Sequence, residues 1–231
     1  TREQVAAIVQ ATGVTAIRSE LELALAESAT ELVLRISYFA QNEDYIRDLV
    51  LQAYYATPVH ALGMPDVSIS IYPDSGRQRI VEILLDYPLD RHEMEKRKQE
   101  VSETLEELAQ ELAGRPDLPR AAARALLEAG DYDPQAGPTP YDLFQAGAAN
   151  SEGLSLAYAA LCQTLGLPCQ VARGTREEEP CFWTVVQTDG GWRHLDLSRP
   201  GGEDDAFFTD KQFSELGYLW EEGSLPLCTE Q

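Results

Sequence analysis

Residues 150–168 read Asn-Ser-Glu-Gly-Leu-Ser-Leu-Ala-Tyr-Ala-Ala-Leu-Cys-Gln-Thr-Leu-Gly-Leu-Pro, and this stretch decides the fold. Its apolar residues recur at helical spacing, so we expect a helix over 152–165 with one packed face. Gly-Leu-Pro at 166–168 is a typical helix end. The helix begins beside a small polar residue, Ser151, which is where a nucleophile sits when an enzyme places one at the N-terminus of a buried helix.

The segment after this helix predicts an antiparallel sheet. Apolar runs at 169–173, 182–188 and 193–197 have the length of strands, and the last two are joined by Asp-Gly-Gly, a hairpin turn. Cys181 precedes the middle strand, and His194 and Asp196 lie in the last one. Because alternate residues of a strand share a face, we expect His194 and Asp196 to point the same way.

The first half of the chain predicts a separate small α+β module. A long amphipathic helix over 90–112 ends this half, because Gly-Arg-Pro follows it. We therefore expect an α+β chain of two domains, residues 1–115 and 116–231. The other elements expected in the first domain are helices at 16–28 and 44–55 and strands at 31–39, 67–72 and 79–87.

The order of several residues in the second half resembles that of a known family. Tyr141 stands ahead of the helix, Glu152-Gly153 follow the nucleophile position, Trp183 lies near the start of the middle strand, and Asp196 lies in the last strand. Together with Tyr132-Asp133-Pro134, these marks resemble the transglutaminase-like family, which shares its fold and triad logic with papain-like cysteine proteases. The resemblance covers roughly residues 132–228, and the C-terminal end is similar to that of many bacterial members.

The resemblance implies a catalytic triad in which two positions are substituted. The family attacks an amide carbonyl with a cysteine thiolate, which a histidine activates and an aspartate orients. Here Ser151 occupies the cysteine position and Cys181 the histidine position, so only Asp196 is retained. Losing nucleophile and base together costs on the order of 10⁶ in turnover. The resemblance therefore implies a pseudoenzyme that binds or scaffolds rather than reacts.

Two active alternatives remain open at the level of sequence. His194 could act as a substitute base for Ser151, with Asp196 as its partner. Alternatively, Cys181 could be a relocated nucleophile with His194 as its base, since neighbours on antiparallel strands lie close together. Either would make the chain a thiol or serine hydrolase or an acyltransferase. Against both, Ser151 could be an ordinary helix N-cap and Cys181 a small half-buried filler.

A cleft beside the triad positions is the expected binding site. The resemblance implies that Tyr141, Glu152 and Trp183 line it. Gln145 precedes Ser151 by six residues, the offset of the oxyanion-hole glutamine in papain-type enzymes, although an exposed helical glutamine explains it equally well. We expect the cleft to hold a peptide or a protein segment.

Composition limits the partners. The 231 residues carry a formal net charge of −21, which argues against binding to nucleic acid and indicates an acidic, well-solvated surface. No apolar run reaches the roughly 18 residues of a membrane span. No cysteine pair has the C-x-x-C spacing of a zinc or redox site, and Glu177-Glu178-Glu179 lacks the spacing of a calcium loop. We therefore predict no metal and no cofactor.

The location of the protein is inferred only by analogy. The resemblance to bacterial members, together with a first residue, Thr1, that is not methionine, favours the cell envelope or another extracytoplasmic place. A cytoplasmic location stays open.

Overall fold

The computed structural model describes residues 7–199 and 207–230. Its contacts divide the chain into two compact units, Thr1–Met94 and Glu95–Gln231. The sequence predicts a boundary at residue 115, which assigns the whole of the long helix α3 (Arg91–Leu112) to the first unit. Most of α3 belongs to the second unit, in which Arg97 lies with its guanidinium 4.4 Å from the ring centre of Tyr141.

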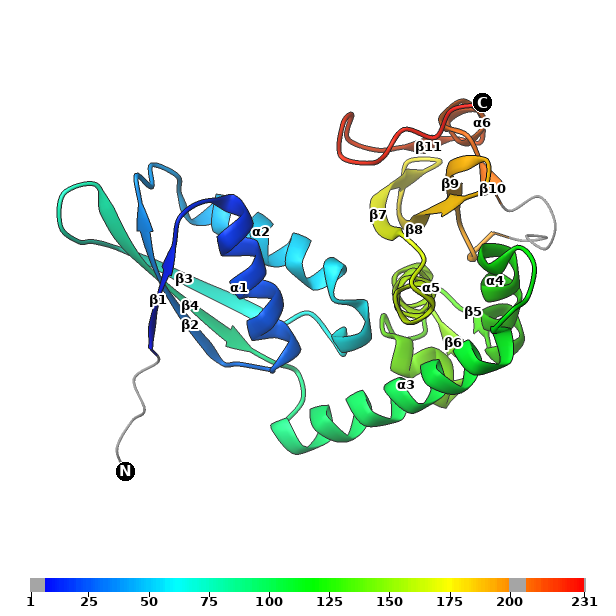
Figure 1. Cartoon of the computed structure of the whole chain (residues 1–231), viewed down its shortest axis with the longest axis horizontal. Coiled ribbons are helices and arrows are strands. Elements are labelled where there is room, and N and C mark those ends of the chain that lie inside the picture. The colour runs from blue at the N-terminus through cyan, green and yellow to red at the C-terminus, as the bar shows by residue number, and fades with distance from the viewer. Residues whose placement is uncertain (1–6, 200–206, 231) are drawn as a thin grey trace. The chain divides into compact units, whose positions relative to one another are not determined.

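The first unit is a four-stranded sheet with two helices on one face (Figure 1). The strands lie in the order β1-β2-β4-β3; β1 is parallel to β2, and the other pairs are antiparallel. Leu32, Leu34 and Ile36 alternate along β2 and are buried, as expected for a strand with one face on the core. The elements are β1 (Ile8–Ala11), α1 (Val14–Ala26), β2 (Glu31–Ser37), α2 (Glu43–Ala56), the turn Pro58–His60, β3 (Asp66–Pro73) and β4 (Gln78–Asp86).

The expected elements of this unit are confirmed, and one was missed. Asn42 caps α2, since its side chain accepts a hydrogen bond from the Tyr45 backbone N–H at 3.1 Å. The edge strand β1 was not expected. Its four residues are too few to show strand alternation, and only parallel pairing with β2 defines it.

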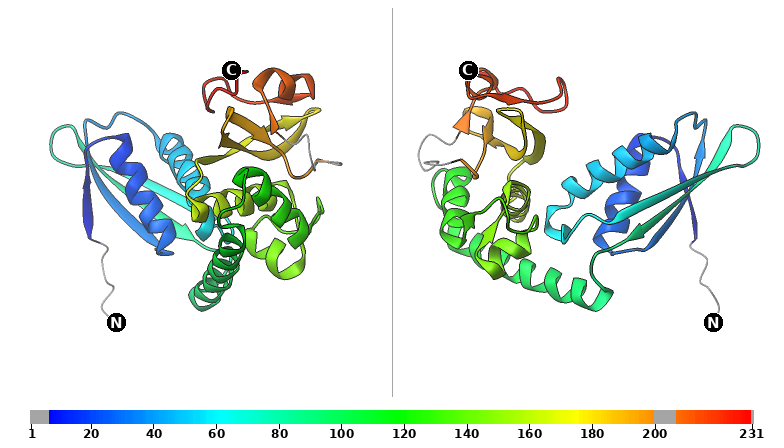
Figure 2. Two further views of the ribbon diagram at one scale, coloured as in Figure 1. Left: turned by 45° about the vertical axis from the view of Figure 1, so that its right-hand side comes forward. Right: turned by 180° about the vertical axis from the view of Figure 1, so that it is seen from behind.

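The second unit is a five-stranded antiparallel sheet in the order β10-β9-β8-β7-β11. Helix α5 packs on one face, and α6 with the C-terminal segment lies on the other (Figures 1 and 2). The predicted helix packed on an antiparallel sheet is therefore confirmed. The elements after α3 are α4 (Leu118–Ala129), β5 (Asp131–Tyr132), the helical turn Asp142–Ala146, β6 (Ala148–Ala149), α5 (Ser151–Leu165), β7 (Cys169–Arg176), β8 (Glu179–Thr188), β9 (Gly191–Leu195), β10 (Phe207–Phe208), α6 (Asp210–Glu215) and β11 (Tyr218–Leu219).

Strand register decides which side chains meet on each face of this sheet. Cys181, Trp183 and Val185 of β8 face α6 and the C-terminal segment, where they join a buried cluster with Phe213 and Tyr218. The alternate residues of β8 therefore face α5. No helix among the described residues is both long and apolar enough to span a membrane.

Candidate functional site

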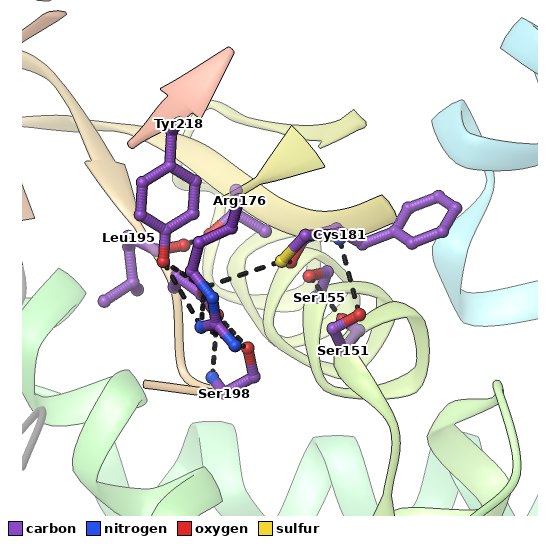
Figure 3. Close-up of polar contacts among 10 residues, drawn as sticks. Ser151, Ser155, Arg176, Cys181, Leu195, Ser198 and Tyr218 are labelled. Atoms are coloured by element: carbon purple, nitrogen blue, oxygen red, sulfur yellow. Dashed lines mark hydrogen bonds and ion pairs between the residues drawn. The ribbon is translucent and has the colours of Figure 1, made fainter. Parts of the chain in front are cut away.

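Ser151 is the first residue of α5, and its hydroxyl faces the start of β8. The N-cap is Asn150, whose side chain accepts a hydrogen bond from the Gly153 N–H at 3.0 Å. The interpretation of Ser151 as an N-cap is therefore wrong, because the preceding residue fills that role. The Ser151 hydroxyl oxygen instead accepts from the Phe182 N–H at 3.4 Å (Figure 3). This contact joins the first residue of α5 to β8, the strand that contains Cys181.

The Cys181 thiol lies within hydrogen-bond distance of two acceptors. Its Sγ is 3.4 Å from the carbonyl oxygen of Phe182 and 3.7 Å from Asp196 Oδ2, and the residue is only 5% exposed. In Figure 3 its sulfur points toward Arg176, Tyr218 and Ser198. Burial, and then the negative charge of Asp196, raise the pKa of the Cys181 thiol to about 11. The group therefore stays a protonated thiol at neutral pH, and a thiol is a weak nucleophile and a poor base.

Asp196 is the centre of the site's polar contacts. Its side chain is 1% exposed, so its charge needs partners to remain buried. One oxygen, Oδ1, accepts from the Ser198 N–H at 2.7 Å and from the Ser198 hydroxyl at 2.6 Å. The other, Oδ2, accepts from Arg176 Nη1 at 3.2 Å and from the Tyr218 hydroxyl, as well as from Cys181.

Arg176, Ser198 and Tyr218 are the site residues that sequence reasoning missed. Arg176 ends β7 and pairs in register with Tyr218 of β11, so both reach the carboxylate from one edge of the sheet. Burial of Tyr218, and then the negative charge of Asp196, raise the pKa of its hydroxyl. Only Ser198 could have been found from the sequence. In an Asp-x-Ser segment the aspartate side chain commonly accepts a hydrogen bond from the backbone two residues later. Nothing local in the sequence points to Arg176 or Tyr218.

His194 shares a sheet face with Asp196, as expected, but its ring is bonded elsewhere. The indole N–H of Trp183 donates to His194 Nδ1 at 3.0 Å, and Nε2 lies 2.8 Å from Asp210 Oδ1. Since Nδ1 accepts, the single ring proton is on Nε2 and is donated to Asp210. The ring is fully buried and stacked on Phe213. The hydrogen bonds of the His194 ring are thus to Trp183 and Asp210 and not to Ser151 or Cys181.

A second polar cluster ties the C-terminal segment to β9. Asp210 accepts from the Cys228 N–H at 3.0 Å, and ligand atoms of His194, Asp210 and Cys228 all lie within 4.8 Å of one another. A metal bound at His194 Nε2 would displace the proton there and move it to Nδ1. That nitrogen already faces the Trp183 N–H, which can only donate. The geometry is that of a hydrogen-bonded cluster.

The predicted cleft residues are dispersed. Trp183 is fully buried in the cluster between the sheet and α6, so it does not line an open cleft. Tyr141 lies against Arg97, and Gln145 is exposed in the turn Asp142–Ala146. Glu152 is half-buried next to Ser151. A hollow of about 410 Å³ between the end of α3 and α4 is lined by other residues, among them Arg115, Arg120 and Arg124.

Three solved structures are similar to this chain at low identity. A TGase is 16% identical, with a TM-score of 0.39, and the match covers 94% of this chain and 66% of that one. A candidate cysteine protease from Cytophaga hutchinsonii is 12% identical with a TM-score of 0.38, covering 62% of this chain and 65% of that one. A candidate protease from Parabacteroides distasonis is 10% identical with a TM-score of 0.33, covering 73% and 43%. The chain thus spans less than two thirds of the length of each.

No protein-family model matches the sequence, and no curated protein does.

The Cys181 thiol should resist alkylation. We expect iodoacetamide to modify it at pH 7.5 at least ~100-fold more slowly in the folded protein than in the unfolded chain, because a pKa raised from 9.0 to about 11 reduces the thiolate fraction by that factor. Peptide mass spectrometry over a time course measures the rate. Rapid labelling that His194→Gln abolishes would instead identify Cys181 as an activated nucleophile.

Stability should depend on the charge state of His194. Burial lowers the pKa of its imidazole, so the unfolded chain, with a histidine pKa of about 6.5, binds the proton more tightly. The contribution of neutral His194 to the free energy of unfolding is fully present above pH ~6.5. It decreases as the pH falls toward the folded-state pKa. His194 faces the carboxylate of Asp210, which also contacts Cys228, and Arg193 lies near that cysteine.

Thermal unfolding followed by circular dichroism between about pH 7.5 and 5.5 measures this dependence. We expect His194→Gln to reduce the loss of Tm on acidification, and His92→Gln, at an exposed histidine, to leave it unchanged. Equal loss in wild type and in His194→Gln would mean that another group carries it.

Proposed function

We propose that this chain is a catalytically inactive transglutaminase-like protein that binds or scaffolds a peptide or protein segment at the bacterial cell envelope. One observation carries the proposal: the group beside Asp196 on the side of Ser151 is the thiol of Cys181, whose Sγ lies 3.7 Å from Asp196 Oδ2. An imidazole in that position would accept the nucleophile's proton on one nitrogen while the aspartate held the other. A thiol has a single reactive atom and cannot serve both neighbours.

The chemistry of Ser151 makes the missing base decisive. A serine hydroxyl ionises far less readily than a thiol, so it depends on an adjacent base to become a nucleophile. The second unit contains a single histidine, His194, and both of its ring nitrogens are engaged by Trp183 and Asp210. These contacts support the inactive assignment and leave the hydrolase alternative without a proton acceptor.

The surface around Ser151 supports binding. Ser151, Glu152 and Phe182 are each partly exposed, and they surround the point where an acyl donor would approach in an active relative. An extended peptide would meet a mixed polar and aromatic surface there. The net charge of −21 disfavours polyanions, so nucleic acid is not the partner. The envelope location rests on the sequence resemblance.

Activity assays test the inactive assignment directly. We expect wild type to hydrolyse or transamidate glutamine-containing peptides no faster than Ser151→Ala, because neither protein has a base beside position 151. A wild-type rate clearly above that of Ser151→Ala would show that the serine reacts, and the proposal would then fail.

Restoring the triad tests the link to the transglutaminase-like family. In the double variant Ser151→Cys with Cys181→His, we expect the introduced thiol to react with iodoacetamide at pH 7 about 10–30-fold faster than in Ser151→Cys alone, since a neighbouring imidazolium and the helix N-terminus stabilise a thiolate. Folding is checked by circular dichroism. Equal rates in the two folded variants would mean that positions 151, 181 and 196 are not the remnant of a triad.

Peptide binding is tested at the same surface. Fluorescence polarisation with a panel of labelled extended peptides should detect binding to wild type that weakens at least tenfold in Ser151→Gln, whose longer side chain fills the approach to the helix end. Gln163→Ala, at an exposed position farther along α5, is the matched control. If Ser151→Gln binds every peptide as wild type does, the site lies elsewhere.

A further inference from the structure

The longer edge strand of the first sheet, β3, is open on one side. The strand order β1-β2-β4-β3 places β3 at an edge, where its only partner among the described residues is β4 (Figure 1). β3 spans 8 residues, whereas β1 at the other edge spans 4. The outer side of an edge strand presents backbone N–H and C=O groups to which another strand can bond. β3 therefore offers the longer surface for pairing with a further chain.

The register of β3 and β4 decides which backbone groups point outward. Along an antiparallel pair, successive residues turn their N–H and C=O groups alternately toward the partner strand and away from it. Asp74, just after β3, bonds through its N–H to the carbonyl oxygen of Gln78 at 3.2 Å. Residues of β3 that precede Asp74 by an even number therefore bond to β4. The backbone groups that point outward are those of Val67, Ile69 and Ile71.

A contact from α2 supports this assignment. Arg47 Nη1 donates to the carbonyl oxygen of Val67 at 2.8 Å, so this oxygen points away from β4. A carbonyl oxygen has two lone pairs and can accept from a neighbouring strand as well. In the part of the chain that the structure describes, no strand lies beside the outward groups of Ile69 and Ile71.

The side chains of β3 also favour contact with another strand. Residues 67–72 read Val-Ser-Ile-Ser-Ile-Tyr and carry no charge, although charged side chains are a common protection of edge strands. The apolar side chains share the face on which α2 packs, where Ile69 is buried while Val67 and Ile71 are only half-buried. A strand added beside β3 would cover these two half-buried side chains.

We propose that two copies of this chain associate through β3, so that the two strands pair antiparallel across a two-fold axis and join the sheets into one. With the axis at Ile69, each Ile69 exchanges both backbone hydrogen bonds with its counterpart, and Val67 does so with Ile71 of the second copy. Valine and isoleucine side chains then meet on the helix side, and Ser68 meets Ser70 on the other. The strand is complementary to itself, as a symmetric dimer requires.

Charge favours this register. With the axis at Ile69, Asp66 lies opposite the uncharged Tyr72 of the second copy. Arg47 then lies near the end of the second strand, which leads to the oppositely charged Asp74. With the axis shifted by one residue, Asp66 would instead lie opposite Asp74, and like charges directly opposite destabilise a strand pair. The net charge of −21 on each copy opposes association, so added salt should strengthen the dimer.

The mass of the full chain at increasing concentration tests the proposal. In sedimentation equilibrium between about 5 and 500 µM, we expect the mean mass of wild type to rise from that of one chain toward that of two. Ile71→Pro removes an outward N–H and leaves the hydrogen bonds between β3 and β4 in place, so association should weaken about tenfold or more. Ile71→Ala, the matched control, keeps this N–H and should associate within ~3-fold of wild type.

Amide hydrogen exchange of wild type, read by NMR, supplies a second readout. The amides of Ile69 and Ile71 should exchange more slowly in a concentrated sample than in a dilute one, whereas those of Ser68 and Ser70, already bonded to β4, should exchange equally slowly in both.

A wild type that stays monomeric at every concentration would overturn the proposal and leave this edge to a segment of another protein. A dimer without the alternating protection, or with equal association in Ile71→Pro and Ile71→Ala, would overturn it too. The exchange readout needs only wild type, so it decides the question even if Ile71→Pro fails to fold. Pairing through β3 does not involve Ser151, so neither result bears on whether that serine reacts.

Discussion

A buried carboxylate must be neutralised and hydrogen-bonded, and in this protein that requirement organises the second unit. Asp196 lies beneath the surface with Arg176 as its counter-charge and with donors from Ser198, Tyr218 and Cys181. Removing one partner from such a group leaves a charge or a polar atom uncompensated, at a cost of several kcal/mol. The network joins β7, β8, β11 and the segment that follows β9, and Phe182, the neighbour of Cys181 in β8, contacts Ser151.

The partners of Asp196 differ from those of the aspartate in a catalytic triad. In an active triad the aspartate faces an imidazolium, and its charge supports the transfer of a proton. Here the positive partner is Arg176, a group that keeps its proton at all accessible pH values. The Cys181 thiol contacts the same oxygen. In the described part of the chain the Ser151 hydroxyl bonds to the Phe182 N–H, which cannot take up its proton.

The elements of the fold could be predicted from sequence because their signals are local. Helix α5 and the strands β7 to β9 follow from spacing and turn chemistry, whereas the four-residue strand β1 depends on pairing with β2. The site was predicted less completely. Periodicity placed His194 on the correct face, but its hydrogen bond to Asp210 depends on how α6 packs. Arg176 and Tyr218 are brought together beside Asp196 by the pairing of β7 with β11, which no local sequence pattern predicts.

The free energy of unfolding of Asp196→Asn, compared with that of Ser151→Ala, tests the structural role of this network most directly. Urea unfolding of the full chain, followed by tryptophan fluorescence, reports on it because Trp183 is buried in the second unit. We expect Asp196→Asn to lower the free energy of unfolding by about 3 kcal/mol, because it leaves Arg176 without its counter-charge, and Ser151→Ala to lower it by less than about 1 kcal/mol. An Asp196→Asn variant as stable as wild type would contradict the account.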